Sequence, residues 1–107
     1  MLENRSFDHM LGALQAVVPD LDGVPAVGPP RTNPDVAGQP VAQLPVAAPI
    51  VKPDPMHDNA DVLEQLDAGN GRFVKNYQRA YPDATAGQIQ AVMAYHALDS
   101  LSVLHQL

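Results

Sequence analysis

The sequence predicts a piece of an α/β domain that is itself mostly helical, with an extended connector in its middle. Apolar residues recur at helical spacing near both ends of the 107-residue chain. Between those ends, residues 19–55 hold 10 of the 11 prolines, which lack backbone donors and exclude a helix of any length. The chain therefore divides into residues 1–18, 19–55 and 56–107, which we expect to be parts of one incomplete domain.

The composition excludes several classes of function. Twelve acidic and six basic side chains give a net charge of -6, whereas a nucleic-acid-binding surface needs clustered basic groups. The absence of cysteine excludes a disulfide framework, a thiolate metal site and a cysteine nucleophile. No apolar run approaches the roughly 18 residues of a transmembrane segment. The N-terminus shows no signal peptide, and the compartment stays open.

The first segment predicts one helix over residues 7–18. Ser6 is a suitable N-cap, and Asp8 lies in the first turn, where the helix dipole favours a carboxylate. Pro19 ends the helix, because the residue before a proline is pushed out of the α region. The face expected to be buried consists of Met10, Leu11, Leu14, Val17 and Val18.

The proline-rich segment predicts an extended strap. Its apolar residues are Val, Ala and Leu, and Asp22-Gly23 and Asn33-Pro34 are turn signals. A flexible polar linker would be richer in Ser and charged residues. We therefore expect a polyproline-like strand lying on a larger surface.

The third segment opens with a helix capped by Asp58 or Asn59 and ended by the turn at residues 69–71. We expect its buried face to carry Val62, Leu63 and Leu66. The acids Asp58, Asp61, Glu64 and Asp67 recur every three residues without the pattern of an EF-hand loop. We interpret them as a solvated helix face.

Three further helical pieces follow. One carries a stripe of packing residues, Phe73, Val74, Tyr77 and Tyr81, and ends at Pro82. The next begins at a capping box formed by Thr85 and Gln88. The last is capped by Asp99 or Ser100 and stops in mid-pattern at Leu107, so we expect the domain to continue.

The residues that carry chemistry lie near the N-terminus. Glu3 offers a carboxylate and Asn4 an amide oxygen, where an apolar strand end meets a helix. Such oxygen donors suit a divalent cation, and Arg5 suits either a phosphate or Asp8. From residue types alone, the favoured alternative is plainer: Glu3 and Arg5 are solvated, while Asn4 and Ser6 cap the helix.

The stretch at residues 3–9, Glu-Asn-Arg-Ser-Phe-Asp-His, closely resembles the first signature of a bacterial phosphoesterase family that includes nonspecific phospholipases C and acid phosphatases. Gly12 also sits where the family has its glycine. Weaker likenesses follow in the same order at His57-Asp58, Gly69–Val74, Val92–His96 and Leu101–His105. The departures are Ala94 for a family glycine, His96 for a tyrosine and Ser102 for a proline.

The resemblance implies an alkaline-phosphatase-like α/β/α sandwich and a metal-dependent hydrolase of phosphate esters or phospholipids. It implies Glu3 and Asn4 as ligands of a divalent metal of unspecified identity, and His57 as a catalytic-site residue near the substrate phosphate. The nucleophile and remaining ligands would lie beyond Leu107, and the strand before Glu3 would be cut to two residues. We therefore expect a fragment, truncated at both ends and inactive alone, from a family whose members are often exported.

A non-catalytic helical interaction module is the alternative from another class. It is motivated by the incomplete site and by the amphipathic stripes. The histidines add no metal pair, because His96 and His105 are nine residues apart, and His9 is interpreted as a packing or supporting residue. Ser6, Ser100 and Ser102 are better explained as cap or helix-start residues than as nucleophiles.

Overall fold

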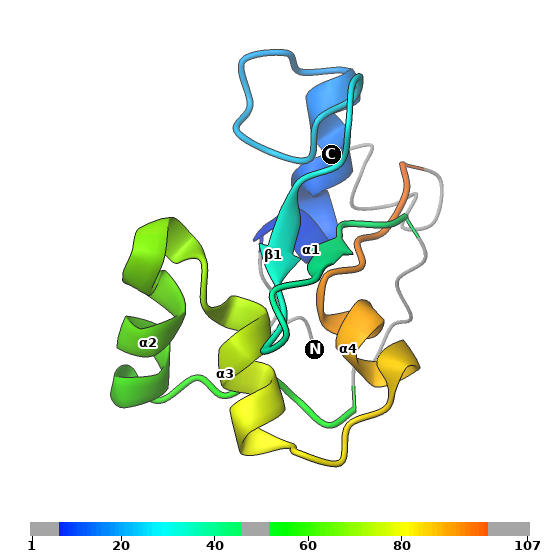
Figure 1. Cartoon of the computed structure of the whole chain (residues 1–107). Helices are drawn as coiled ribbons and strands as arrows, with labels where there is room; N and C mark the ends of the chain where they lie inside the picture. The colour runs from blue at the N-terminus through cyan, green and yellow to red at the C-terminus, as the bar shows by residue number, and fades with distance from the viewer. Residues whose placement is uncertain (1–6, 46–51, 99–107) are drawn as a thin grey trace.

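The computed structural model describes residues 7–45 and 52–98, which form a short hairpin surrounded by helices (Figure 1). The predicted ligands Glu3 and Asn4 and the predicted last helix lie outside the described residues. The helices and strands in chain order are α1 (Phe7–Leu11), the 3-10 helix η1 (Gly12–Ala16), β1 (Thr32–Pro34), β2 (Pro40–Ala42), α2 (Asn59–Asn70), α3 (Phe73–Ala80) and α4 (Ala86–Val92).

The helix predicted over residues 7–18 is shorter and divided. α1 ends after five residues, and the chain continues as the 3-10 helix η1 to Ala16. The cause is a close backbone contact: the Val24 N–H donates to the Gly12 carbonyl at 3.0 Å. A Cβ at Gly23 would lie 2.5 Å from that same oxygen. Because the Gly12 carbonyl is drawn to the loop, regular α-helical bonding stops there.

The proline-rich segment folds into a hairpin, whereas an extended strap was expected. β1 and β2 pair antiparallel, with Thr32 opposite Ala42 and Pro34 opposite Pro40. The Asp35 carboxylate holds the turn by accepting from the N–H groups of Ala37 and Gln39 at 2.9 and 2.8 Å. The short polar turn between prolines thus supplies bonds that the strand prolines cannot make.

The α2 helix begins as predicted, but its predicted orientation was wrong. Asp58 is the N-cap, and its carboxylate accepts from the Asp61 N–H at 3.0 Å. The helix breaks near its end, where Ala68, Gly69 and Asn70 all have positive φ. Its predicted buried residues, Val62, Leu63 and Leu66, are exposed (36%, 61% and 55%).

The later helices follow the sequence pattern. In α3, Val74 and Tyr77 are buried, and Tyr77 packs on Tyr81 with ring centroids 5.1 Å apart. In α4, the predicted capping box is present, with the Gln88 N–H donating to Thr85 Oγ1 and the Thr85 N–H donating to the Gln88 side chain.

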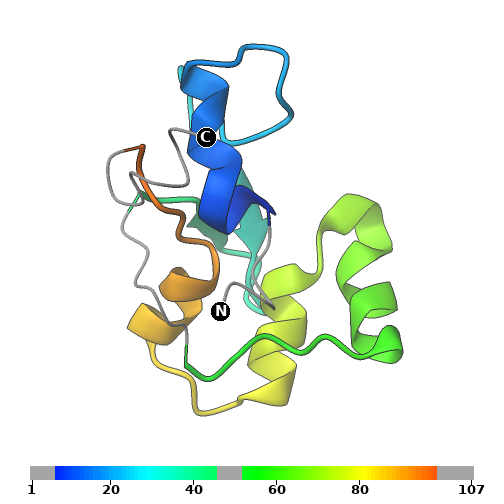
Figure 2. The same ribbon diagram turned by 180° about the vertical axis from the view of Figure 1, so that it is seen from behind.

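The hairpin lies between the α2–α3 arm and α4, with α1 behind it in Figure 1 and in front of it in Figure 2. Within the described ranges the buried apolar side chains are few and come from all three segments: Met10, Val24, Val74, Tyr77 and Ala94. Buried polar residues therefore share the task of joining the elements. No helix within the described ranges has the length and apolar character needed to cross a bilayer.

Candidate functional site

The described structure begins three residues after the predicted ligand Asn4, at the start of α1. Phe7, Asp8 and His9, the last three residues of the motif, all line a pocket of about 600 Å³. Glu3 and Asn4 themselves lie outside the described residues. The described part of the motif therefore forms part of the wall of this pocket.

The same pocket collects segments that are far apart in the sequence. Its other walls come from the end of α2 and the start of α3, from the end of α4 with the residues after it, and from the proline-rich segment. The lining residues from these segments are Gly69, Asn70 and Phe73; Val92, Met93, Ala94 and Tyr95; and Asp22, Arg31, Thr32, Asn33 and Gln43. Three of the stretches singled out by the family resemblance thus meet at one pocket.

Side chains of the hairpin hold these walls together. The buried Asn33 donates to the Asn70 carbonyl at 2.8 Å and accepts from the Val74 N–H at 3.0 Å. On the other side, the Gln43 amide donates to Asp8 Oδ2 at 3.0 Å. The hairpin is therefore clamped between α1 and the α2–α3 turn.

A pair of buried histidines joins the motif to the segment after α4. The His9 Nδ1–H donates to the Ala94 carbonyl at 3.0 Å, and the His96 N–H donates to the His9 carbonyl at 2.8 Å. The two rings pack edge to face with centroids 5.1 Å apart. The predicted packing role of His9 is confirmed, and His96, a departure from the family pattern, is its packing partner. Both residues have under a tenth of their surface exposed.

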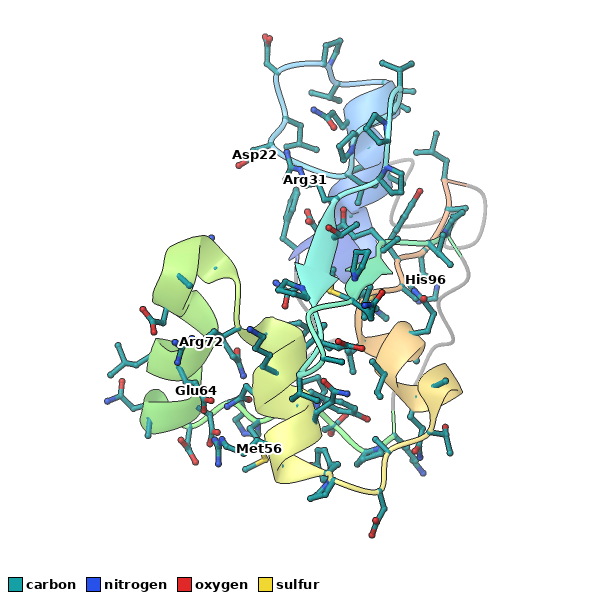
Figure 3. All side chains as sticks on the ribbon, viewed as in Figure 1. Asp22, Arg31, Met56, Glu64, Arg72 and His96 are labelled. Atoms are coloured by element: carbon teal, nitrogen blue, oxygen red, sulfur yellow. The ribbon has the colours of Figure 1, made fainter. Side chains whose placement is uncertain are left out.

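One permanently charged cation lines the pocket among the described residues. Arg31 Nη2 lies 3.2 Å from Asp22 Oδ1, and both side chains are exposed (51% and 92%). Figure 3 places this pair beside β1, away from Arg72 on the α2–α3 arm. An ion pair this open to water contributes little to stability.

His57 lies outside the pocket lining. It is exposed, and it immediately precedes the Asp58 cap of α2. The stretch before it is anchored to α3 and α2. The anchoring bonds are Tyr77 Oη to the Pro53 carbonyl at 2.9 Å, Tyr81 Oη to the Asp54 carbonyl at 2.8 Å, and Gln65 Nε2 to the Met56 carbonyl at 2.8 Å. Burial raises the pKa of Tyr77, which keeps its hydroxyl a donor. The backbone that leads to His57 is therefore held in place, and His57 itself is not among the residues that line the pocket.

The acidic face of α2 is the clearest correction to the interpretation from sequence. Asp61 is buried (7% exposed), and its carboxylate accepts from Asn76 at 2.7 Å and Arg79 at 2.6 Å. Glu64 also accepts from Arg79, which holds the pKa of its carboxyl below the usual range. These groups join α2 to α3, so Asp61 and Glu64 hold the two helices together and are not a solvated face. The sequence contained a sign of this pairing, because Asn76 and Arg79 are three residues apart, as are Asp61 and Glu64.

No cluster of three or more His, Asp or Glu suited to a metal ion occurs within residues 7–45 and 52–98. The acids of α2 are already engaged by Asn76 and Arg79. The described residues thus contribute the wall of the pocket and the cationic side chain of Arg31 to the candidate site.

Sequence comparison with known proteins gives a family match and a match to a characterised relative. A family model described as the Phosphoesterase family matches residues 1–107. The non-specific phospholipase C3 of Arabidopsis thaliana is 40% identical over 67 residues. The match covers 60% of this chain and 13% of that protein, so the chain spans only a small part of this relative's length.

Proposed function

The chain belongs to the Phosphoesterase family, and on that premise we propose that it forms part of a metal-dependent site that hydrolyses phosphate esters. The reaction would be of the phospholipase C or acid phosphatase type. One observation carries the proposal: the end of the Glu-Asn-Arg-Ser-Phe-Asp-His motif and two other family-like stretches line the same pocket. We also propose that the surrounding fold is an alkaline-phosphatase-like α/β/α sandwich.

Glu3 and Asn4 are the proposed metal ligands. Their carboxylate and amide oxygens have the chemistry that hard divalent cations prefer. Such an ion, when bound, would polarise a phosphoryl oxygen and help to activate a hydroxyl group. The chain's own part is positioning, because phosphoryl transfer depends mainly on placing the reactants and neutralising charge.

Residues of α1 fix the part of the chain that directly follows the proposed ligands. The motif continues directly into α1, whose His9 is buried and bonded to the Ala94 carbonyl. Asp8 is held by Gln43 of the hairpin. The helix that follows the proposed ligands is therefore fixed on two sides.

His57 is proposed to contact the substrate phosphate. Its imidazole is exposed, and the preceding stretch is held by hydrogen bonds from Tyr77 and Tyr81. Contact of His57 with the phosphate predicts that, in the active graft described below, His57→Gln raises KM for a phosphate ester several-fold without unfolding the protein.

The 107-residue chain alone should show no measurable turnover. Two oxygen donors fall well short of the roughly six that a divalent cation of this kind takes. The described residues add no group of three metal-binding side chains. Hydrolysis of 4-nitrophenyl phosphate by the purified chain that disappears in Glu3→Ala would contradict this expectation.

The function itself is tested by grafting. Residues 1–107 would replace the matching stretch of the Arabidopsis relative, and phospholipase activity would be measured with and without Glu3→Ala. We expect activity in the graft and its loss in the variant, because the ligand is required. Lys75→Ala, a change on α3 outside the pocket lining, is the matched control and should leave activity intact. A folded graft that is active with Ala at position 3 would refute the assigned site.

One observation favours the alternative of a non-catalytic helical interaction module. The apolar side chains Val62, Leu63 and Leu66 of α2 face solvent. In that case the isolated chain should unfold in one cooperative thermal transition and should lose a partner-binding face in Leu63→Ser. A broad, weak transition would instead favour the phosphoesterase proposal, in which this chain is part of a larger site.

A further inference from the structure

Arg31 occupies a position that the family resemblance did not mark. It belongs to the proline-rich segment, yet it lines the pocket together with Phe7, Asp8 and His9 of the motif. It lies 23 residues after Asp8 in the sequence, and the fold brings the two segments to one cavity. A phosphate ester entering this pocket would meet a guanidinium group.

The backbone of Arg31 is held on a firm element. Its carbonyl accepts from the Gln43 N–H at 2.9 Å, directly beside the paired strands β1 and β2. Two residues later, Asn33 is bonded to both Asn70 and Val74. The hairpin therefore fixes where the arginine side chain starts, relative to both α1 and the α2–α3 turn.

The partner of Arg31 is easily replaced. Asp22 accepts a single bond of 3.2 Å, and its side chain is 92% exposed. Arginine has five N–H donors in a fork that matches two oxygens of a phosphate, so one bond to Asp22 uses little of its capacity. A dianionic phosphate would compete well with such an open carboxylate.

The other acid at the pocket is already engaged. Asp8 accepts from Gln43 at 3.0 Å, which offsets part of its repulsion toward an anion. Asp22 is therefore the carboxylate that competes most directly for the guanidinium. Removing its charge should strengthen anion binding, which gives the site a gain-of-function test.

We propose that Arg31 binds the phosphoryl oxygens of the substrate, exchanging Asp22 for the phosphate as the ester enters the pocket. This inference rests on the proposed function and names a substrate-binding residue for the same site. The ester is recognised through its anionic phosphate group, which monoesters and phospholipid diesters share. Asp22 holds the guanidinium in place before the substrate arrives.

Titration with inorganic phosphate tests the proposal on the 107-residue chain itself. Amide chemical shifts would be followed by NMR at constant ionic strength, with chloride as the reference anion. Arg31→Gln should weaken phosphate binding about tenfold or more, as expected for lost charge-assisted bonds. Asp22→Asn should strengthen it roughly two- to fivefold, the equivalent of removing one exposed ion pair.

The chain offers a matched control. Arg72 and Asp67 form a comparable exposed pair, with Nε and Oδ2 3.3 Å apart, and neither residue lines the pocket. Arg72→Gln removes the same charge, so it should leave the phosphate affinity within about twofold if binding requires the pocket. Arg31→Lys should restore part of the affinity, because the charge remains while the fork is lost.

The outcomes separate this inference from the function on which it rests. Equal loss in Arg31→Gln and Arg72→Gln, or no change in Asp22→Asn, would overturn the role of Arg31 even if the graft hydrolyses phospholipid. Arg31-dependent phosphate binding in a chain whose folded graft is inactive would support the anion site and refute the hydrolase. Replacing phosphate with dimethyl phosphate distinguishes the sources: diester binding that also depends on Arg31 indicates a phospholipid, and its absence a monoester.

Discussion

Replacing Asn76 with alanine would show how far the polar contact between α2 and α3 stabilises the fold. The Asn76 side chain is fully buried, and its amide donates to Asp61 at 2.7 Å and to Glu64 at 2.8 Å. Its carbonyl oxygen accepts from Gln65 at 3.0 Å. Alanine removes all three bonds and leaves the buried Asp61 carboxylate dependent on Arg79.

The expected loss follows from these contacts. A hydrogen bond to a charged group contributes about 1.5–3 kcal/mol and a neutral one about 1 kcal/mol. Alanine recovers about 0.6 kcal/mol through its better helix propensity, and Arg79 still satisfies part of the Asp61 charge. The bonds to Glu64 and Gln65 are only partly buried, so water replaces them at small cost and the buried bond to Asp61 dominates. We therefore expect the free energy of unfolding to fall by about 2–3 kcal/mol, a large share of the stability of a domain this size.

Native-state hydrogen exchange at the amides of α2 and α3, followed by NMR, measures this loss without requiring a single cooperative transition. Protection there should fall by roughly 30- to 150-fold, the equivalent of about 2–3 kcal/mol. Lys75→Ala, on the same helix, is the control and should change stability by less than about 0.5 kcal/mol. If Asn76→Ala matches this control, the cluster contributes nothing, and the view of α2 as a solvated acidic face is restored.

Three further predictions concern acid stability, the hairpin and the metal. The hydrogen bond from Arg79 holds the pKa of Glu64 below its usual 4.5. The stability that the ionised Glu64 adds to the fold is therefore complete above pH 4.5 and is lost as the pH falls through the lowered pKa. Glu64→Gln should remove this acid-dependent loss from a curve of stability against pH. Asn33→Ala should cost about 2 kcal/mol and speed hydrogen exchange at the Val74 amide, because two buried bonds disappear. Unchanged exchange there would refute the clamp. In the graft, which supplies the remaining ligands, Glu3→Gln should weaken Mn²⁺ binding on the order of tenfold, because a charged ligand becomes neutral. Binding would be followed by electron paramagnetic resonance, and equal binding with Glu or Gln at position 3 would remove Glu3 from the metal site.

Local signals in the sequence predicted local structure well. Asp58 caps α2, Thr85 and Gln88 form the capping box of α4, and the α3 stripe buries Val74 and Tyr77. These outcomes depend on residues three or four apart, so the chain carries their cause within one turn of helix. The motif at residues 3–9 likewise indicated the Phosphoesterase family, to which the chain belongs.

Contacts between distant segments were not predictable in this way. The sequence pattern of α2 placed Leu63 inside and Asp61 outside, and the structure reverses both. The reversal depends on Asn76 and Arg79, which lie 15 and 18 residues from Asp61 and satisfy its carboxylate. A buried charge is acceptable once it is paired, but a hydropathy pattern contains no information about the partner.

The sequence by itself determined the starts of α2 and α4, the family and the candidate ligands Glu3 and Asn4. Tertiary structure alone decided that the proline-rich segment forms a hairpin, that the helix after the motif shortens where Val24 bonds to Gly12, and that Arg31 reaches the pocket. The physical reason is the range of the interactions involved. Caps and periodic faces act within a few residues, whereas a pocket is made by backbone and side-chain bonds between segments that meet only when the chain is folded.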